Sequence, residues 1–575
     1  MKKSYVMNRV SILTYKGKII DVCNLLYDLK LIEFFESSYA NLNSIDKSDV
    51  EVESEELVSI RSAISQIKPY FTQASGAYSN NSIEQIHVLI NKKQDCKQKL
   101  IQAKDFKLRD KVKKNLKLTS KEIEKGFIGY VEKNNEYNLS EYKKEFKQTR
   151  TFEFNNRVYF YTNIKPIFSF KEYFIPLNLS KQYSQKELED DLKYINTELK
   201  NIANSNLRHL QAQELKLSKE VEVEKSKEYF KESNKFVVIE GFVPAHKTHE
   251  LDIALRQKLA DSYEIEVENI KEVEENVPVM LPNKGLMKSF EDLISFYSFP
   301  KYREIDPSIL MLIFFPIFFG LILGDVGYGT LTLLIFSALK FKFPDMKNLF
   351  SVMQLSSISS ILFGILYGEY FGYEPKLFPF EFHRVDYPET MLIIALLFGL
   401  LHINIGYIVG IMNNINKSVK KVFTDYVSWI ILQIAIAALY FGYTSQLTSL
   451  VYSGYLGVLI TLVLLYIGHG LQGVIEITSI FTNIMSYARL MAVGISSVVI
   501  AVLINEFSFP LFQGNIISIF FGIILITTAH TFNMVLGNFE SFLQALRLHY
   551  VEFFSKFYEG GGREFNPFGS KIREE

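Results

Sequence analysis

Apolar positions are distributed unevenly along this chain, and the change comes near residue 308. In the first 300 residues, charged and amide side chains interrupt the apolar stretches. Beyond that point the chain consists of long apolar runs joined by short polar loops. A helix needs about 20 apolar residues to cross the hydrocarbon core. We therefore predict eight membrane spans, at about 309–323, 326–339, 349–367, 390–413, 425–443, 454–471, 476–505 and 516–554.

The first two spans form one apolar segment unless the chain turns at GDVGYG, residues 324–329. Length does not decide between one span and two, because a single helix would be longer than a bilayer requires and two helices would each be shorter. Loop charge decides, because residues 340–348 and 414–423 are basic and basic loops face the cytoplasm. A single span would place the first 300 residues outside, yet the N-terminus has no unbroken apolar stretch typical of a signal peptide. We expect eight spans in the inner (plasma) membrane, with both termini cytoplasmic.

The last two predicted spans are longer than a bilayer requires. About 39 residues at a rise of ~1.5 Å extend for ~58 Å, which is roughly twice the hydrocarbon thickness. Such a helix either tilts strongly or projects into the cytosol. We predict a pair of long, tilted C-terminal helices.

The polar half predicts a mainly helical arm. Residues 82–116 and 185–230 are charged, free of proline and glycine, and have apolar residues at spacings of three and four. This pattern predicts two helices packed as an antiparallel hairpin or coiled coil, although a charged helix face can also be simply solvated. The fold class is thus mainly α, with α/β lobes on a two-helix rod in residues 1–300 and a transmembrane bundle in 301–575. Strand patterns occur, among other places, at residues 8–15, 127–133, 157–164 and 171–179, and a strand–helix–strand pattern at 235–270.

Composition limits the chemistry that the chain can perform. Lys and Arg number 63, as do Asp and Glu, so the net charge points to no partner. Neither of the two cysteines belongs to a group at metal-ligand spacing. The sequence has no G-x-x-x-x-G-K-[ST] loop and no G-x-G-x-x-G turn after a strand. We expect no bound cofactor or metal, no nucleic-acid partner and no catalytic centre in this chain.

Arginine is the costliest residue in the apolar half. A cation near the middle of a membrane helix costs at least ~2.5–3.5 kcal/mol, and Arg489 lies near the middle of its run. In the last run, Glu540, Gln544 and Arg547 share one helix face. The alternatives are that Arg489 snorkels to the interface or caps a buried carboxylate, and that Glu540 and Arg547 form a local pair near the cytoplasmic end. Further candidates to line a wet path are Glu476, Asp325, Glu369, His402, His469 and His530, and each histidine taken alone is as readily a packing residue.

Charge of this kind inside a membrane indicates ion movement. Two other classes stay open. A self-contained secondary transporter with a cytosolic regulatory domain is one, but we find no inverted repeat between the first four and the last four spans. A membrane scaffold that transports nothing is the other, and it leaves both arginines unexplained.

Several motifs resemble the large stator membrane subunit of rotary V/A-type ATPases, called subunit I or subunit a. They are SYARLMAVGISS, LQALRLHYVEFFSKFYEGGGREFNPF, FFGLILGDVGYG, GILYGEYFG, FEDLISFYSFPKYREIDPS and the soluble EGFVP. The resemblance covers about residues 275–570 and extends to the arm by architecture only. It implies a membrane stator that forms ion half-channels against a rotating ring of proteolipids and has no catalytic site of its own.

The resemblance also implies residue roles. Arg489 would face the ring, Arg547 would be the second arginine of the family, Gln544 the polar residue one turn before it, and Glu476 the acid before the first motif. An arginine favours the ionised form of a nearby ring carboxylate. The H⁺ or Na⁺ of that carboxylate then leaves through one half-channel, and another ion enters through the other.

Two positions depart from the eukaryotic pattern. Ser497 stands where eukaryotic relatives have a histidine, and Gly537 where they have an acid. The chain therefore resembles the bacterial and archaeal branch. The implied partners are the proteolipid (c/K) ring, peripheral-stalk E/G-type subunits, a nearby central-stalk C/d-type subunit and the lipid bilayer. The sequence does not distinguish H⁺ from Na⁺, because the ring carboxylate belongs to another chain.

Overall fold

The computed structural model describes residues 3–36, 43–44, 50–72, 83–116, 127–132, 150–154, 157–162, 184–260, 262–270, 276–375 and 382–570. The chain divides into two compact units. The main unit comprises Met1–Asn41 and Lys231–Ser570, and the arm unit comprises Leu42–Phe230 with Lys571–Glu575. The strand predicted at 171–179 lies outside the described residues.

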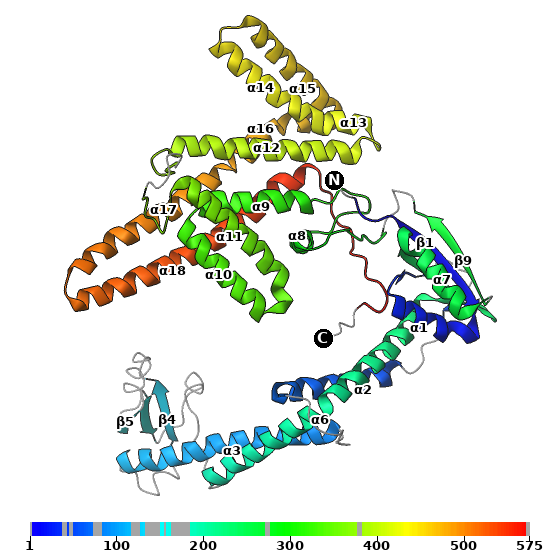
Figure 1. The fold of residues 1–575 in the computed structure, drawn as a ribbon, viewed down its shortest axis with the longest axis vertical. Helices are drawn as coiled ribbons and strands as arrows, with labels where there is room; N and C mark the ends of the chain where they lie inside the picture. Colours follow the sequence, from blue (N-terminus) through cyan, green and yellow to red (C-terminus); the bar gives the residue numbers. More distant parts are fainter. Residues whose placement is uncertain are drawn as a thin grey trace. The chain divides into compact units, whose positions relative to one another are not determined.

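The arm unit is built on the helices α2 (Val50–Ile67), α3 (Ile83–Leu116) and α6 (Gln185–Ser226) (Figure 1). The long helices predicted at 82–116 and 185–230 are α3 and α6. The helix α6 packs against both α2 and α3. Their shared apolar core includes Ile60, Ile64, Ile67, Ile86, Ile202, Leu207 and Leu210.

The helix α2 was not predicted, and it makes the packing a three-helix arrangement rather than a simple two-helix rod. Its first half is acidic, and only Ile60, Ile64 and Ile67 recur at helical spacing in its second half. The arm unit also holds an antiparallel sheet of β4 (Phe127–Glu132), β6 (Arg157–Thr162) and β5 (Arg150–Phe154), in that order. Strands were predicted at β4 and β6, and β5 was missed.

A sheet in the main unit joins distant parts of the polar half. The strand β1 (Met7–Tyr15) pairs antiparallel with β8 (Phe236–Pro244) on one side and with β9 (Tyr263–Asn269) on the other. The helices α1 (Ile19–Leu29) and α7 (Thr248–Leu259) contact each other beside it (Figure 1). The strand–helix–strand predicted at 235–270 is therefore β8, α7 and β9.

The apolar half is helical almost throughout. Among the described residues, six helical segments are long and apolar enough to cross a membrane, and α9 is a shorter apolar helix. In chain order the helices are α9 (Ser308–Leu323), α10 (Val326–Lys342), α11 (Lys347–Tyr367), α12 (Pro388–Asn414), α13 (Val419–Val422), α14 (Ser428–Thr444), α15 (Thr448–Ile475), α16 (Ile477–Met485), α17 (Ala488–Ser508) and α18 (Ile516–Arg547).

The apolar segment at 308–342 contains two helices, as the loop charges predicted. The helix α9 ends at Leu323, and the Asp325 side chain caps α10 by accepting a hydrogen bond from the Tyr328 backbone N–H at 2.8 Å. A Cβ at Gly324 would lie 2.5 Å from Tyr367, so the turn needs glycine to let α11 approach. The membrane orientation of both helices stays a prediction.

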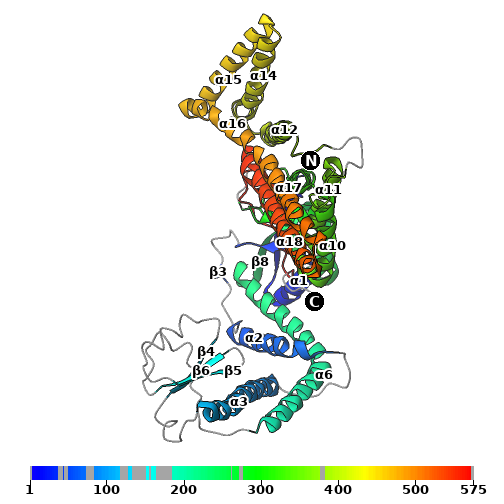
Figure 2. The same cartoon turned by 90° about the vertical axis from the view of Figure 1, so that its left-hand side faces the viewer.

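The helix α9 is the centre of the apolar core. It contacts α11, α17, α18 and α8 (Leu286–Ser295). Its side chains Phe315, Phe318 and Phe319 are fully buried, as expected for a helix that is hydrophobic on all sides. The helices α17 and α18 lie side by side, and α14 and α15 form a hairpin (Figures 1 and 2).

The span predicted at 476–505 lies within one apolar helical segment, Ile477–Gln513, which a two-residue turn divides into α16 and α17. The helix α16 ends at Met485, and α17 begins at Ala488. Between them the backbone tightens, since the Leu490 N–H donates to the Tyr487 carbonyl three residues earlier. Tyr487 packs closely on α12, where a Cβ at Gly399 would lie 2.5 Å from its ring. Arg489 therefore lies inside this segment, just after the turn and at the start of α17.

The last helix is as long as predicted. After Arg547, α18 continues through a π-helical turn, Leu548–Phe553, and a short 3₁₀ turn, Phe554–Lys556. The resulting apolar segment, Ile516–Lys556, has 41 residues. At ~1.5 Å per residue it is about 60 Å long.

Candidate functional site

Arg489 has a carboxylate partner within the chain. Its Nη2 donates to Oε1 of Glu552 at 2.8 Å, and its Nε donates to the Ser486 carbonyl at 3.0 Å. The Glu552 side chain is 2% exposed, whereas that of Arg489 is 27% exposed. Part of the guanidinium thus remains accessible. A guanidinium has five N–H donors, so Arg489 can hold a second carboxylate while it keeps Glu552.

Glu552 was not among the predicted site residues. It lies in the π-helical turn Leu548–Phe553, which turns both His549 and Glu552 into the protein, where both are buried. Such turns inside α-helices are frequent at functional sites. The available signal was a lone carboxylate in the run LHYVEFF, close to a second intramembrane arginine.

Aromatic and imidazole rings surround the kink before Arg489. Nδ1 of His402 lies 2.8 Å from the Tyr487 hydroxyl, and the His402 ring stacks on Phe553 with centroids 3.9 Å apart. Nδ1 of His549 lies 2.7 Å from the Ala545 carbonyl. His402 is fully buried, so its geometry fits the packing alternative. Arg489, Glu552, Tyr487, His402 and His549 are called the Arg489 cluster from here on.

The predicted polar face of α18, formed by Glu540, Gln544 and Arg547, is largely directed away from the protein. Glu540 and Arg547 are exposed, and Arg547 has no ion-pair partner among the residues that the structure describes. Gln544 is half-buried, and its Oε1 is buried without a hydrogen-bond partner among those residues. The three side chains are therefore not joined to Arg489 within this chain.

Two other predicted residues lie on exposed surface near the end of α15. Glu476 is exposed and accepts a hydrogen bond from Nε2 of Gln472 at 3.4 Å. Nε2 of His469 lies 3.0 Å from Oδ1 of Asp425, which connects α15 to the π-helical turn before α14. His469 thus has a local structural partner.

Glu369 forms an ion pair with Arg384, a residue that was not predicted. Nε of Arg384 donates to Oε1 of Glu369 at 2.9 Å, and both side chains are buried to within about one per cent of exposure. Nη1 of Arg384 also donates to the Leu321 and Ile322 carbonyls, at 3.1 and 2.9 Å. The guanidinium therefore caps the C-terminus of α9. Sequence reasoning missed Arg384 because it assessed the 368–389 loop only by its net charge.

Two more candidates, Asp325 and His530, lie near the start of α10. Asp325 is buried as the cap of α10 and also accepts from the Gly372 N–H at 3.3 Å. Nδ1 of His530, on α18, lies 2.7 Å from the Tyr328 hydroxyl. His530 and Tyr328 line a pocket of about 420 Å³ between α10, α17, α18 and the loop after α11.

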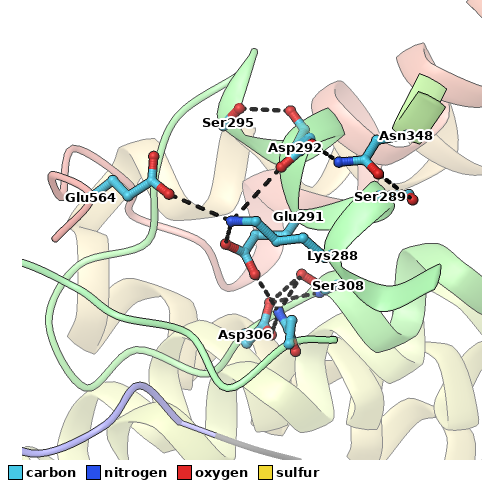
Figure 3. A network of polar contacts seen from close by, with 10 residues as sticks. Lys288, Ser289, Glu291, Asp292, Ser295, Asp306, Ser308, Asn348 and Glu564 are labelled. Carbon is cyan, nitrogen blue, oxygen red and sulfur yellow. Dashed lines mark hydrogen bonds and ion pairs between the residues drawn. The ribbon is translucent and has the colours of Figure 1, made fainter. Parts of the chain in front are cut away.

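A polar network lies just before α9 (Figure 3). Nζ of Lys288 donates to Glu291 at 2.6 Å and lies 3.5 Å from Glu564 in the C-terminal segment. Nδ2 of Asn283 donates to Glu291 at 2.9 Å and to Asp306 at 2.6 Å. Burial raises the pKa of the Glu291 carboxyl, although the Lys288 ammonium acts against this rise. The network ties α8 to the start of α9 and to the C-terminal segment.

Comparison with known proteins gives consistent matches. The V-type ATPase 116kDa subunit family matches residues 171–393 and 476–570. The A-type ATP synthase subunit I of Archaeoglobus fulgidus is 34% identical over 399 residues, which cover 58% of this chain and 58% of that protein. That of Methanocaldococcus jannaschii is 29% identical over 440 residues, which cover 66% and 63%. The chain thus spans about six tenths of the length of these curated relatives.

Two further matches were found. The V-type ATP synthase subunit I of Borreliella burgdorferi is 25% identical over 370 residues, which cover 58% of this chain and 60% of that protein. The solved cytoplasmic N-terminal domain of subunit I, homolog of subunit a, of V-ATPase aligns with 45% of this chain and 99% of its own. Its TM-score is 0.20 at 11% identity, so it carries no argument about the fold.

Proposed function

This chain belongs to the V-type ATPase 116kDa subunit family, and on that premise we propose that it is the membrane stator subunit of a rotary V/A-type ATPase. In this proposal its membrane helices form two half-channels beside a rotating proteolipid ring. The arm unit connects the membrane part to peripheral stalks of the E/G type, and a C/d-type central-stalk subunit lies nearby. Both termini face the cytoplasm. The chain binds no cofactor, and its cargo is H⁺ or Na⁺.

The observation that carries the proposal is the state of Arg489. Its guanidinium lies at a kink in an apolar helical segment, is tied to one buried carboxylate and is still 27% exposed. A charge held at such cost inside apolar helices indicates a functional contact. A ring carboxylate that arrives at Arg489 can share the guanidinium with Glu552, because the fork has donors to spare.

Ion transfer follows from this exchange of partners. A ring carboxylate crosses lipid only when it is neutralised by its ion. Near the fixed positive charge its ionised form is favoured, so the ion departs through one half-channel. After rotation away from Arg489, the carboxylate binds a new ion from the other half-channel. Arg489 also separates the two half-channels, because a fixed cation repels a passing cation.

Glu552 has a positioning role in this scheme. It is buried and directly bonded to Arg489, so it fixes the orientation of the guanidinium without meeting the ring itself. The Ser486 carbonyl provides the second anchor, at Nε. A guanidinium held at two points is preorganised for a third, incoming carboxylate.

Affinity purification of the tagged chain tests the proposal directly. A ring of small proteolipids, stalk subunits and an ATP-hydrolysing head are expected to co-purify in mild detergent. ATP-driven ion uptake into inverted membrane vesicles is the functional readout. A chain that purifies alone and still transports an ion in liposomes would instead be a self-contained secondary transporter.

A further inference from the structure

The His530 pocket contains a continuous chain of hydrogen bonds. Tyr328 lies 2.7 Å from Nδ1 of His530, and Nε2 of His530 lies 3.0 Å from Oδ1 of Asn505. On the other side, Nδ2 of Asn533 donates to the Tyr328 hydroxyl at 3.0 Å and to the Ser497 carbonyl at 3.1 Å. Three helices, α10, α17 and α18, contribute these groups. His530, Tyr328, Asn505 and Asn533 are called the His530 cluster.

The cluster extends from the pocket toward Arg489. His530, Tyr328 and Asn505 line the pocket, whereas Asn533 is buried behind it. Ser497, where the chain of hydrogen bonds ends, lies eight positions after Arg489 on the same helix. Eight residues of α-helix measure about 12 Å. The hydrogen-bonded groups therefore cover part of the distance between the pocket and the Arg489 cluster.

The wall of the pocket is held rigidly. Nδ2 of Asn505 donates to the Phe371 carbonyl at 2.8 Å, and Phe371 has a left-handed backbone with φ of 54°. The next residue, Gly372, approaches α17 so closely that a Cβ there would lie 2.6 Å from Ala501. The same loop follows Glu369, which Arg384 holds. The part of the pocket wall that the structure describes is therefore held in place by specific contacts with α17.

Two positions beside the cluster carry no titratable group. Ser497 has no ionisable side chain, and Gly537 has no side chain; a Cβ there would lie 3.3 Å from the Ser497 hydroxyl, so the two positions face each other. Polar groups in apolar helices are costly and tend to mark ion pathways. The loop that forms the pocket wall follows α11 and is predicted to face outward, since the basic loops before and after it in the chain face the cytoplasm.

We propose that the His530 pocket is the entrance of the outer half-channel, and that His530, Tyr328 and Asn533 carry the ion path from it toward Arg489. This inference rests on the proposed function. Imidazole and hydroxyl groups both donate and accept hydrogen bonds, so they support a chain of water or a moving proton. The pocket holds water, and His530 is the group that meets it.

Substituted cysteines test whether water fills the pocket. Thr527 and Thr531 line it, whereas Phe532 is 64% exposed on the same helix but does not line it. The background carries Cys23→Ala and Cys96→Ser. We expect a membrane-impermeant methanethiosulfonate reagent, added to intact cells, to label Thr527→Cys and Thr531→Cys and to leave Phe532→Cys unlabelled. Absence of external labelling at both threonine positions, or equal labelling at Phe532→Cys, would overturn the proposal.

Transport then tests whether the pocket lies on the ion path. His530→Gln and Tyr328→Phe are each expected to lose most ATP-driven uptake in inverted vesicles while the complex stays assembled, and labelling of Thr531→Cys should inhibit uptake. Full uptake in both variants would overturn the path even if the pocket is wet. Arg489→Ala, measured alongside, reports on the proposed function separately. If Arg489→Ala loses uptake while His530→Gln and Tyr328→Phe keep it, only this inference is refuted and the proposed function stands.

Discussion

Arg489 and Glu552 lie 63 positions apart in the chain, and Nη2 of the arginine donates to Oε1 of the glutamate at 2.8 Å. The contact connects the start of α17 to the π-helical turn after α18. It joins the cation that the sequence singles out in the apolar half to a buried anion that the sequence analysis did not identify. Both partners can be changed one at a time, which makes their roles separable.

The first prediction concerns the charge of Arg489. Arg489→Ala and Arg489→Gln are expected to abolish ATP-driven ion uptake in assembled complexes, because no fixed cation then discharges the ring carboxylate. Arg489→Lys should fail or nearly fail, since an ammonium is compact, strongly hydrated and able to lose its proton when buried. Uptake into inverted vesicles is the measurement, with assembly checked by co-purification of ring and head. Substantial uptake by an assembled Arg489→Ala complex would refute the mechanism.

The second prediction separates stability from transport at the same pair. Arg489→Ala leaves the Glu552 carboxylate buried without its cation, which destabilises the subunit. Complete burial would make this loss ~3–5 kcal/mol, and the partial exposure of Arg489 makes it smaller. Adding Glu552→Gln removes the orphaned charge, so the double variant should regain thermal stability without regaining uptake. A double variant as unstable as Arg489→Ala would show that the pair is not electrostatically coupled.

The third prediction concerns the exposed face of α18. Arg547 is exposed, without an ion-pair partner among the described residues, so we expect its role to lie in contact with the ring. Arg547→Ala should lower the initial rate of uptake partially, and Arg547→Lys should lower it less, because the charge is kept while the planar fork is lost. Glu540→Gln is a matched control on the same face. Wild-type uptake in Arg547→Ala would leave this arginine as a snorkelling side chain.

The fourth prediction concerns Arg384, which holds Glu369 and the end of α9. Arg384→Ala leaves a buried carboxylate and three backbone carbonyls without donors. We expect a loss of about 3–5 kcal/mol in the free energy of unfolding, seen as a lower thermal midpoint of the purified subunit. Arg384→Ala with Glu369→Gln should recover part of it. An unchanged midpoint in Arg384→Ala would mean that the loop is held by its other contacts alone.

The fifth prediction concerns pH and the network around Glu291. Burial raises the folded-state pKa of Glu291 above its ordinary value of 4.5. The stability that this carboxyl contributes is therefore present below the unfolded value and is lost as pH rises through the folded value. As pH rises from about 4.5 through the folded-state pKa of Glu291, wild type should therefore lose stability relative to Glu291→Gln. Thermal midpoints of both proteins, measured from pH 4.5 upward, check the sign.

Sequence periodicity predicted the helices well, and loop charge correctly chose two helices at 308–342. The reason is physical: apolar runs of bilayer length and long charged helices leave strong local patterns. The helix α2 was not predicted, because its apolar stripe, Ile60, Ile64 and Ile67, is short and follows an acidic segment. The turn before Arg489 was not predicted, because the contact of Tyr487 with Gly399 joins two distant helices and leaves no local pattern in the sequence.

The candidate site was predicted in part. Arg489 was identified from the free-energy cost of placing a cation in an apolar membrane helix. Its partner Glu552 could not be identified in this way, because its inward direction depends on a π-helical turn. Arg384 was missed for a similar reason, since a loop residue becomes costly only once the fold buries it. His402 and His530, equal in the sequence, are distinguished only by the structure. The first is sealed among aromatic rings, and the second lines a pocket.

The antiparallel pairing of β1 with β8 has a consequence for biosynthesis. Residues 7–15 are translated more than two hundred residues before their partner strand. The last contacts come later still, because Arg563 pairs with Glu33 and the Phe568 ring meets Tyr27 only after the final helix has been translated and inserted. Non-local pairing of this kind is slow and leaves strand edges open to aggregation. The nascent chain can therefore pair β1 with β8 and β9 before the first apolar helix, α9, is made, whereas the contacts of Arg563 and Phe568 form only after the last one.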